Sequence, residues 1–118
     1  MTIGWKLDAR CREALLERFP PRYSQVVADR VSLLDNAEGD LPVPVLDAKI
    51  IGRVDDGAGV EAMIVALYGS IDRFDGNCWH IPWSHAPDRA AEESRDLIDQ
   101  YGWSELDAAP LKLKPAKW

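Results

Sequence analysis

The chain has 118 residues, 47% of them hydrophobic and 29% charged, with a net charge of −6. This length and composition predict one folded domain over residues 1–118, with a single core and room for one site. The acidic balance argues against extended nucleic-acid binding, because proteins hold a phosphate backbone with clustered lysines and arginines.

Membrane insertion and secretion are also disfavoured by the sequence. No stretch approaches the roughly 18 apolar residues of a membrane span, and the first ten residues lack the apolar run of a secretion signal. We therefore expect a cytoplasmic protein without membrane contact. Cys11 and Cys78 have no partner cysteine at metal-binding spacing and are expected to be reduced, buried thiols. No cofactor or metal is expected.

An amphipathic helix is predicted over residues 9–18. Asp8 is a suitable N-cap, and apolar residues recur at four-residue spacing from Cys11 onward. Pro20 and Pro21 end this pattern, because proline cannot continue a helix.

Four strands are predicted in the middle of the chain. The first covers residues 26–35, which are rich in Val and Leu, and a loop is expected over residues 36–44. The others cover residues 46–54, 60–71 and 77–84. The connections between these three contain Asp and Gly in the pattern of tight hairpins, which predicts an antiparallel meander.

A second helix is predicted after Pro87, with acidic residues early and Gly102 just past its end. The remaining tail, residues 104–118, is interrupted by prolines and is expected to be flexible or to form a short edge strand. The order of elements predicts an α+β fold in which two helices pack on one face of a mostly antiparallel sheet.

Side-chain alternation gives two of these strands an apolar face and a second face with polar residues. In the strand over residues 77–84, the tryptophans share one face, and the other carries Cys78, His80, Pro82 and Ser84. In the strand over residues 26–35, Arg30 and Ser32 lie opposite the large apolar residues.

If these two strands lie close together, Arg30, Ser32, His80 and Ser84 converge on one surface. A guanidinium offers two parallel hydrogen bonds to a phosphate, hydroxyls donate to its oxygens, and an imidazole can transfer a proton. This set suits a phosphodiester or another small phosphorylated ligand such as a nucleotide. Arg30, Ser32 and Ser84 are the predicted substrate-binding residues, and His80 is the predicted catalytic acid or base.

The same residues also fit a structural interpretation. A single histidine on a strand is more often a hydrogen-bonded structural residue than a catalyst. Arg30 beside Asp29 fits a solvated surface pair, and Ser32 fits an ordinary strand position. The sequence alone leaves both interpretations open.

The segments DRVSLL and WHIPWS resemble the paired motifs of the 2H phosphoesterase superfamily. Its members include the cyclic phosphodiesterase domains of tRNA ligases and related RNA-end enzymes. They carry two strands of the form His-x-Thr/Ser-hydrophobic, one in each lobe of a pseudo-symmetric fold. The resemblance covers most of residues 9–101. It implies that two histidines act as base and acid on a phosphodiester, while two hydroxyls hold its phosphate oxygens.

The chain departs from the family pattern once in each motif. Arg30 stands where the first motif has histidine, and Ser32 retains the hydroxyl. Pro82 stands where the second motif has Thr or Ser, and His80 retains the histidine. Arg30 cannot act as a base near neutral pH. The resemblance therefore implies a degenerate member that binds a cyclic nucleotide or an RNA-end cyclic phosphate, with any hydrolysis depending on His80 alone.

A non-catalytic protein-interaction module is the alternative function. Trp5, Trp103 and Trp118 lie outside the predicted meander of this acidic chain, and exposed tryptophans often dominate protein interfaces. Self-association or a defined protein partner favours this alternative, whereas stabilisation by a phosphorylated ligand favours the first interpretation.

Overall fold

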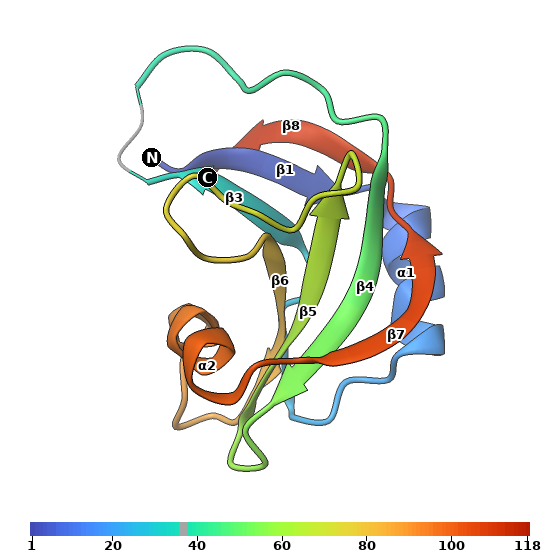
Figure 1. The fold of residues 1–118 in the computed structure, drawn as a ribbon, viewed down its shortest axis with the longest axis vertical. Helices are drawn as coiled ribbons and strands as arrows, with labels where there is room; N and C mark the ends of the chain where they lie inside the picture. Colours follow the sequence, from blue (N-terminus) through green and yellow to red (C-terminus); the bar gives the residue numbers. More distant parts are fainter. Residues whose placement is uncertain (36–37) are drawn as a thin grey trace.

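The computed structural model describes residues 1–35 and 38–118 (Figure 1). This part of the chain forms β1 (Ile3–Leu7), α1 (Ala9–Arg18), β2 (Gln25–Val26), β3 (Arg30–Leu34), β4 (Ala48–Asp55), β5 (Val60–Leu67), β6 (His80–His85), the 3₁₀ helix η1 (Ala91–Glu93), α2 (Ser94–Tyr101), β7 (Ser104–Pro110) and β8 (Leu113–Lys117). Among these residues, none of the helices has the length and apolar composition of a membrane span.

The strands form two antiparallel sheets, which makes this an α+β protein. One sheet has the order β3-β1-β8, and the other has the order β2-β6-β5-β4-β7. The expected meander is present, because β4 pairs with β5 and β5 pairs with β6. The tight hairpin expected between residues 71 and 77 is wrong, since β5 already ends at Leu67 and β6 begins only at His80. The expectation of one sheet is wrong, since the first and last strands of the chain pair with each other in a separate sheet.

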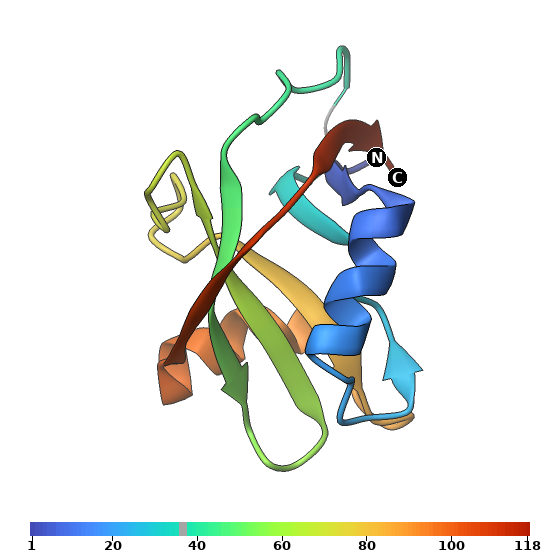
Figure 2. The same cartoon turned by 90° about the vertical axis from the view of Figure 1, so that its right-hand side faces the viewer.

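The two helices cover opposite faces of the five-stranded sheet (Figures 1 and 2). Met63 of β5 packs in the same apolar cluster as Leu15 of α1, together with residues of both sheets. Its neighbour Ile64 points to the other side and packs in the same cluster as Leu97 of α2. The prediction that both helices pack on one face is therefore wrong. Because both faces of β5 are buried, the sheet needs a covering element on each side.

The strand predicted over residues 26–35 is divided into β2 and β3. The amides of Val27 and Ala28 still donate to β6, to the carbonyl oxygens of Trp83 and Pro82 respectively, each at 2.9 Å. At Ala28 the backbone adopts a φ of 43°, which is rare for a residue other than glycine. The chain turns there and leaves the five-stranded sheet, so β3 joins the other sheet while it remains close to β6.

The predicted first helix matches α1, and the amide of Cys11 donates to the Asp8 side chain at 3.3 Å as expected of an N-cap. α2 is shorter than expected, because the segment after Pro87 enters through η1. The tail forms two strands: β7 extends the five-stranded sheet, and β8 is an edge strand of the three-stranded sheet. Of the expected loop over residues 36–44, residues 36 and 37 lie outside the described residues.

Candidate functional site

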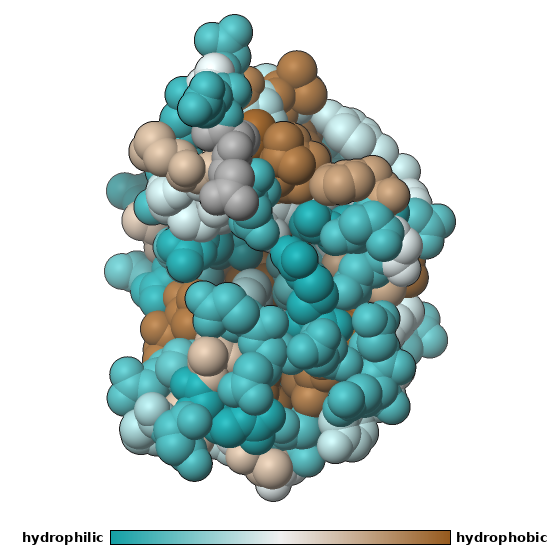
Figure 3. Space-filling model, turned by 90° about the vertical axis from the view of Figure 1, so that its left-hand side faces the viewer, coloured by the Kyte–Doolittle hydropathy of each residue, from teal (hydrophilic) through white to brown (hydrophobic). Residues whose placement is uncertain are grey.

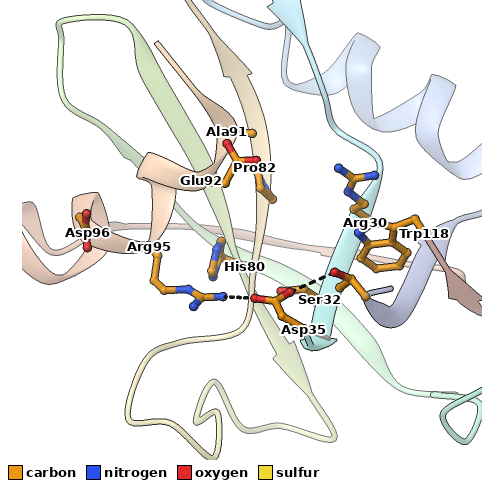
Figure 4. A pocket seen from close by; sticks show the side chains of 11 residues that line it. Arg30, Ser32, Asp35, His80, Pro82, Ala91, Glu92, Arg95, Asp96 and Trp118 are labelled. Atoms are coloured by element: carbon orange, nitrogen blue, oxygen red, sulfur yellow. Dashed lines mark hydrogen bonds and ion pairs between the residues drawn. The ribbon is translucent and has the colours of Figure 1, made fainter. Parts of the chain in front are cut away.

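A pocket of about 360 Å³ opens between β3, β6 and the segment that enters α2 (Figure 4). Arg30, Ser32 and His80, three of the four predicted site residues, line it. Its complete lining within the described part of the chain is Thr2, Arg30, Ser32, Asp35, His80, Pro82, Ala91, Glu92, Arg95, Asp96 and Trp118. This volume is in the lower range of small-molecule sites.

The turn at Ala28 explains why residues of two different sheets face each other. The segment before it is hydrogen-bonded along β6, so β3 begins beside that strand. β3 then presents Arg30 and Ser32 to the pocket, while Val31 between them is fully buried in the core. The alternation predicted for this strand is thus present, although the strand belongs to the other sheet.

The guanidinium of Arg30 lies over the ring of Trp118, 5.0 Å from the ring centroid. Trp118 follows β8, and its backbone exchanges two hydrogen bonds with Thr2, at 2.7 and 2.9 Å. A guanidinium stacked on an aromatic face is already held in one orientation, so it loses little side-chain entropy when it binds a ligand. Its in-plane N–H donors remain available. The stack therefore leaves the edge of the Arg30 guanidinium able to donate hydrogen bonds to an acceptor in the pocket.

Arg73, in the connection between β5 and β6, holds β3 in place. It is 8% exposed, and it donates to the carbonyl oxygens of Ser32 and Leu33. Its Nη1 also lies 3.4 Å from the Oγ of Ser32, which accepts this hydrogen bond. The hydroxyl of Ser32 can consequently direct its own proton toward a ligand.

His80 is 7% exposed, and its Nδ1 lies 2.9 Å from the carbonyl oxygen of Cys78. A carbonyl oxygen only accepts, so Nδ1 carries a proton and Nε2 keeps its lone pair in the neutral ring. Burial lowers the pKa of His80, and this effect exceeds the opposing effect of the hydrogen bond to Cys78. The residue is therefore neutral at pH 7 and suited to act as a base rather than as an acid.

The pocket also contains charges that the sequence did not predict to be there. Arg95, in the first turn of α2, supplies a second guanidinium, and Glu92 and Asp96 come from the same part of the chain. Nη2 of Arg95 lies 3.9 Å from Oδ2 of Asp35, which follows β3 (Figure 4). Periodicity indicated a helix here but not its distance from β3, so no sequence signal identified these residues.

Ser84 does not reach the pocket. The register between β6 and β5 shifts next to Glu61, so that Trp83 of β6 has no partner residue in β5. This β-bulge reverses the alternation of side chains between the two faces of β6 beyond Trp83. The hydroxyl of Ser84 donates to Oε1 of Glu61 at 2.7 Å and accepts from the amide of Tyr23 at 3.2 Å. The prediction that Ser84 shares a surface with His80 is therefore wrong, because the bulge turns Ser84 into a buried hydrogen-bond network.

The three tryptophans of the alternative function do not form one exposed surface. Trp5 is 4% exposed, packs edge-to-face on Trp79 with 5.8 Å between ring centroids, and donates its indole N–H to the carbonyl of Val43 at 2.9 Å. Trp118 lines the pocket, and Trp103 is 37% exposed. The expectation that all three are available to a partner is wrong for Trp5, because its ring is part of the core.

The two cysteines are free thiols, but they are only partly buried, whereas buried thiols were expected. Cys78 packs beside the apolar cluster under α2, and burial raises the pKa of its thiol. A protonated thiol is a poor nucleophile. Cys78 thus contributes its backbone carbonyl, which orients His80, and not its sulfur.

The surface on the side of the molecule where α2 lies is mostly hydrophilic (Figure 3).

Comparison of the chain with models of known protein families, with curated proteins and with solved structures gave no match. The chemistry of the pocket is therefore the basis for assigning a function.

Proposed function

We propose that this protein binds a phosphodiester in the pocket between β3 and β6, as a degenerate relative of the 2H phosphoesterases. One observation carries the proposal. Arg30, Ser32, His80 and Pro82, which stand at the four motif positions, line the same pocket although they come from two sheets. This is the arrangement that the resemblance implies, with a guanidinium in place of one histidine and a proline in place of one hydroxyl.

The binding chemistry follows from these groups. Arg30 offers N–H donors in one plane, which match two oxygens of a phosphodiester. Ser32 donates its hydroxyl proton to an oxygen of the same phosphate while its own oxygen accepts from Arg73. A cyclic nucleotide or an RNA-end cyclic phosphate is a ligand of suitable chemistry, since each carries one singly charged phosphodiester.

Hydrolysis depends on His80 alone. Its Nε2 would take a proton from a water molecule while the water oxygen forms a bond to phosphorus. The bond from phosphorus to the leaving oxygen breaks, and that oxygen takes up a proton from the imidazolium or from solvent. A single positioned base contributes about 10² to 10⁴ in rate, so turnover would be far slower than with two histidines.

Binding is the first test. Adenosine 2′,3′-cyclic phosphate is titrated against the wild type while the melting temperature is recorded, because a ligand that binds the native state raises it. Arg30→Ala should abolish the increase. Arg10→Ala, which removes an exposed arginine of α1 outside the pocket, should retain it. An increase that survives in Arg30→Ala, or no increase in the wild type, would contradict the proposal.

Hydrolysis is tested separately with a panel of 2′,3′-cyclic nucleotides, RNA-end cyclic phosphates and cyclic dinucleotides. Turnover that disappears in His80→Ala would establish a phosphoesterase with one histidine. Binding without turnover would establish a recognition protein that has kept the pocket but not the reaction. Turnover that is equal in the wild type and in His80→Ala would refute the role of His80.

A further inference from the structure

The side chains that line the pocket carry more negative than positive charge. Arg30 and Arg95 are the two cations among them, and the three anions are Asp35, Glu92 and Asp96. Because His80 is neutral at pH 7, it does not change this balance. A pocket that binds an anion beside carboxylates is expected to discriminate between ligands by their charge.

Asp35 has the most central position of the three carboxylates (Figure 4). It lies between Arg95, at 3.9 Å, and Thr2, whose hydroxyl donates to Oδ1 of Asp35 at 3.1 Å. Ser32 lies three residues before it in the chain and lines the same pocket. An anion held by Arg30 and Ser32 therefore lies near the negative charge of Asp35, which shares the second guanidinium of the pocket, Arg95, in a partly exposed ion pair.

We infer that Asp35 is a specificity-determining residue, which makes the pocket select singly charged phosphodiesters over doubly charged phosphate monoesters. This inference rests on the proposed function. A phosphodiester carries one negative charge, which the guanidinium of Arg30 neutralises. A phosphate monoester carries a charge of about −1.5 to −2 at pH 7, because its second pKa is about 6. The additional charge faces Asp35, and the second guanidinium of the pocket, Arg95, is shared with that carboxylate.

Asp35 can also form a favourable hydrogen bond with the ligand. Its carboxylate accepts hydrogen bonds, so a hydroxyl or amino group of the ligand can approach the side of the pocket that repels a second phosphate charge. A nucleoside with a cyclic phosphate has such donors, whereas inorganic phosphate and polyphosphates add mainly charge. The selectivity consequently combines repulsion of the wrong ligand with a hydrogen bond to the right one.

The test compares two ligands that share the same base and ribose, adenosine 2′,3′-cyclic phosphate and adenosine 3′-monophosphate. Their dissociation constants are measured by calorimetry at pH 8, where the monoester is doubly charged, and phosphorus NMR verifies that the cyclic ligand is intact. The variant Asp35→Asn removes the charge and keeps an oxygen that accepts from Thr2. The control Asp47→Asn makes the same change in net charge at an exposed site outside the pocket.

The wild type should bind the cyclic diester more tightly than the monoester. Asp35→Asn should reduce this preference by about two- to fivefold, the size expected for one partly screened charge, and Asp47→Asn should leave it unchanged. An undiminished preference in Asp35→Asn would overturn the inference, and the proposed function would stand if Arg30→Ala still abolished binding of both ligands. Failure of the wild type to bind either ligand would overturn both.

Discussion

The guanidinium of Arg12 in α1 holds the backbone at Ala28, where the chain passes from one sheet to the other. Nε of Arg12 donates to the carbonyl oxygen of Ala28 at 2.9 Å, and Nη2 donates to that of Val27 at 3.2 Å. Ala28 is fully buried and has a positive φ, so this backbone conformation costs free energy that the surrounding contacts must offset. This change of chain direction at Ala28 brings Arg30 to the pocket that His80 also lines.

Arg12→Ala is expected to destabilise the protein and to weaken ligand binding at the same time. Two partly buried hydrogen bonds to backbone carbonyl oxygens lose their charged donor, which predicts a loss of about 1–2 kcal/mol in the free energy of unfolding. The position of β3 then becomes less restricted, so the effect of the cyclic ligand on melting temperature should shrink. Urea denaturation and ligand titration of Arg12→Ala and Arg10→Ala check this, because Arg10 is an exposed residue of the same helix. Equal behaviour of the two variants would contradict it.

Ser84→Ala is expected to reduce stability without changing ligand affinity. The hydroxyl of Ser84 is buried and donates to Glu61, so its removal leaves a buried carboxylate oxygen and the amide of Tyr23 each without one partner. The expected loss is about 1–2 kcal/mol. Chemical denaturation measures it, and the cyclic ligand should bind Ser84→Ala as it binds the wild type. A selective loss of affinity would show that Ser84 contributes to the pocket after all.

His80 predicts how the stability of the protein changes with pH. Because burial lowers its pKa below the ordinary value of 6.5, the unfolded chain binds a proton more readily than the native protein does. Stability from this residue is therefore complete above pH 6.5 and is lost as the pH falls through the pKa of the folded state.

The comparison of the wild type with His80→Gln isolates this effect. The difference between their free energies of unfolding should increase with pH below about 6.5 and stay constant above it. Urea denaturation between pH 5 and pH 8 measures both proteins, and His85 is common to them. A difference that does not change with pH, or that increases toward acid, would contradict the lowered pKa of His80.

Trp5→Ala is expected to cost about 3–5 kcal/mol, as for other large aromatic residues removed from a core. The ring of Trp5 packs against Trp79, and its indole N–H is bonded to the carbonyl of Val43. Trp103→Ala should cost much less, because Trp103 is 37% exposed. Thermal and urea denaturation of the two variants checks the contrast. Comparable stability of both would contradict the burial of Trp5.

Several features were predictable because they depend on neighbouring residues. The helix over residues 9–18 has its own cap and stop signals, and the hairpin from β4 to β5 has an Asp-Gly connection. Alternation correctly placed Arg30 and Ser32 opposite Val31, and it separated His80 from Ile81. Each of these predictions needs only a few consecutive side chains.

The sequence by itself therefore determined α1, the meander of β4, β5 and β6, and the side-chain directions of Arg30, Ser32 and His80. Only the tertiary structure decided that β3 joins another sheet, that α1 and α2 cover opposite faces, and that Ser84 turns away from His80. The physical reason is that these outcomes depend on contacts between distant segments. Arg12 stabilises the turn at Ala28, and a bulge at Trp83 reverses an alternation that a regular strand would keep.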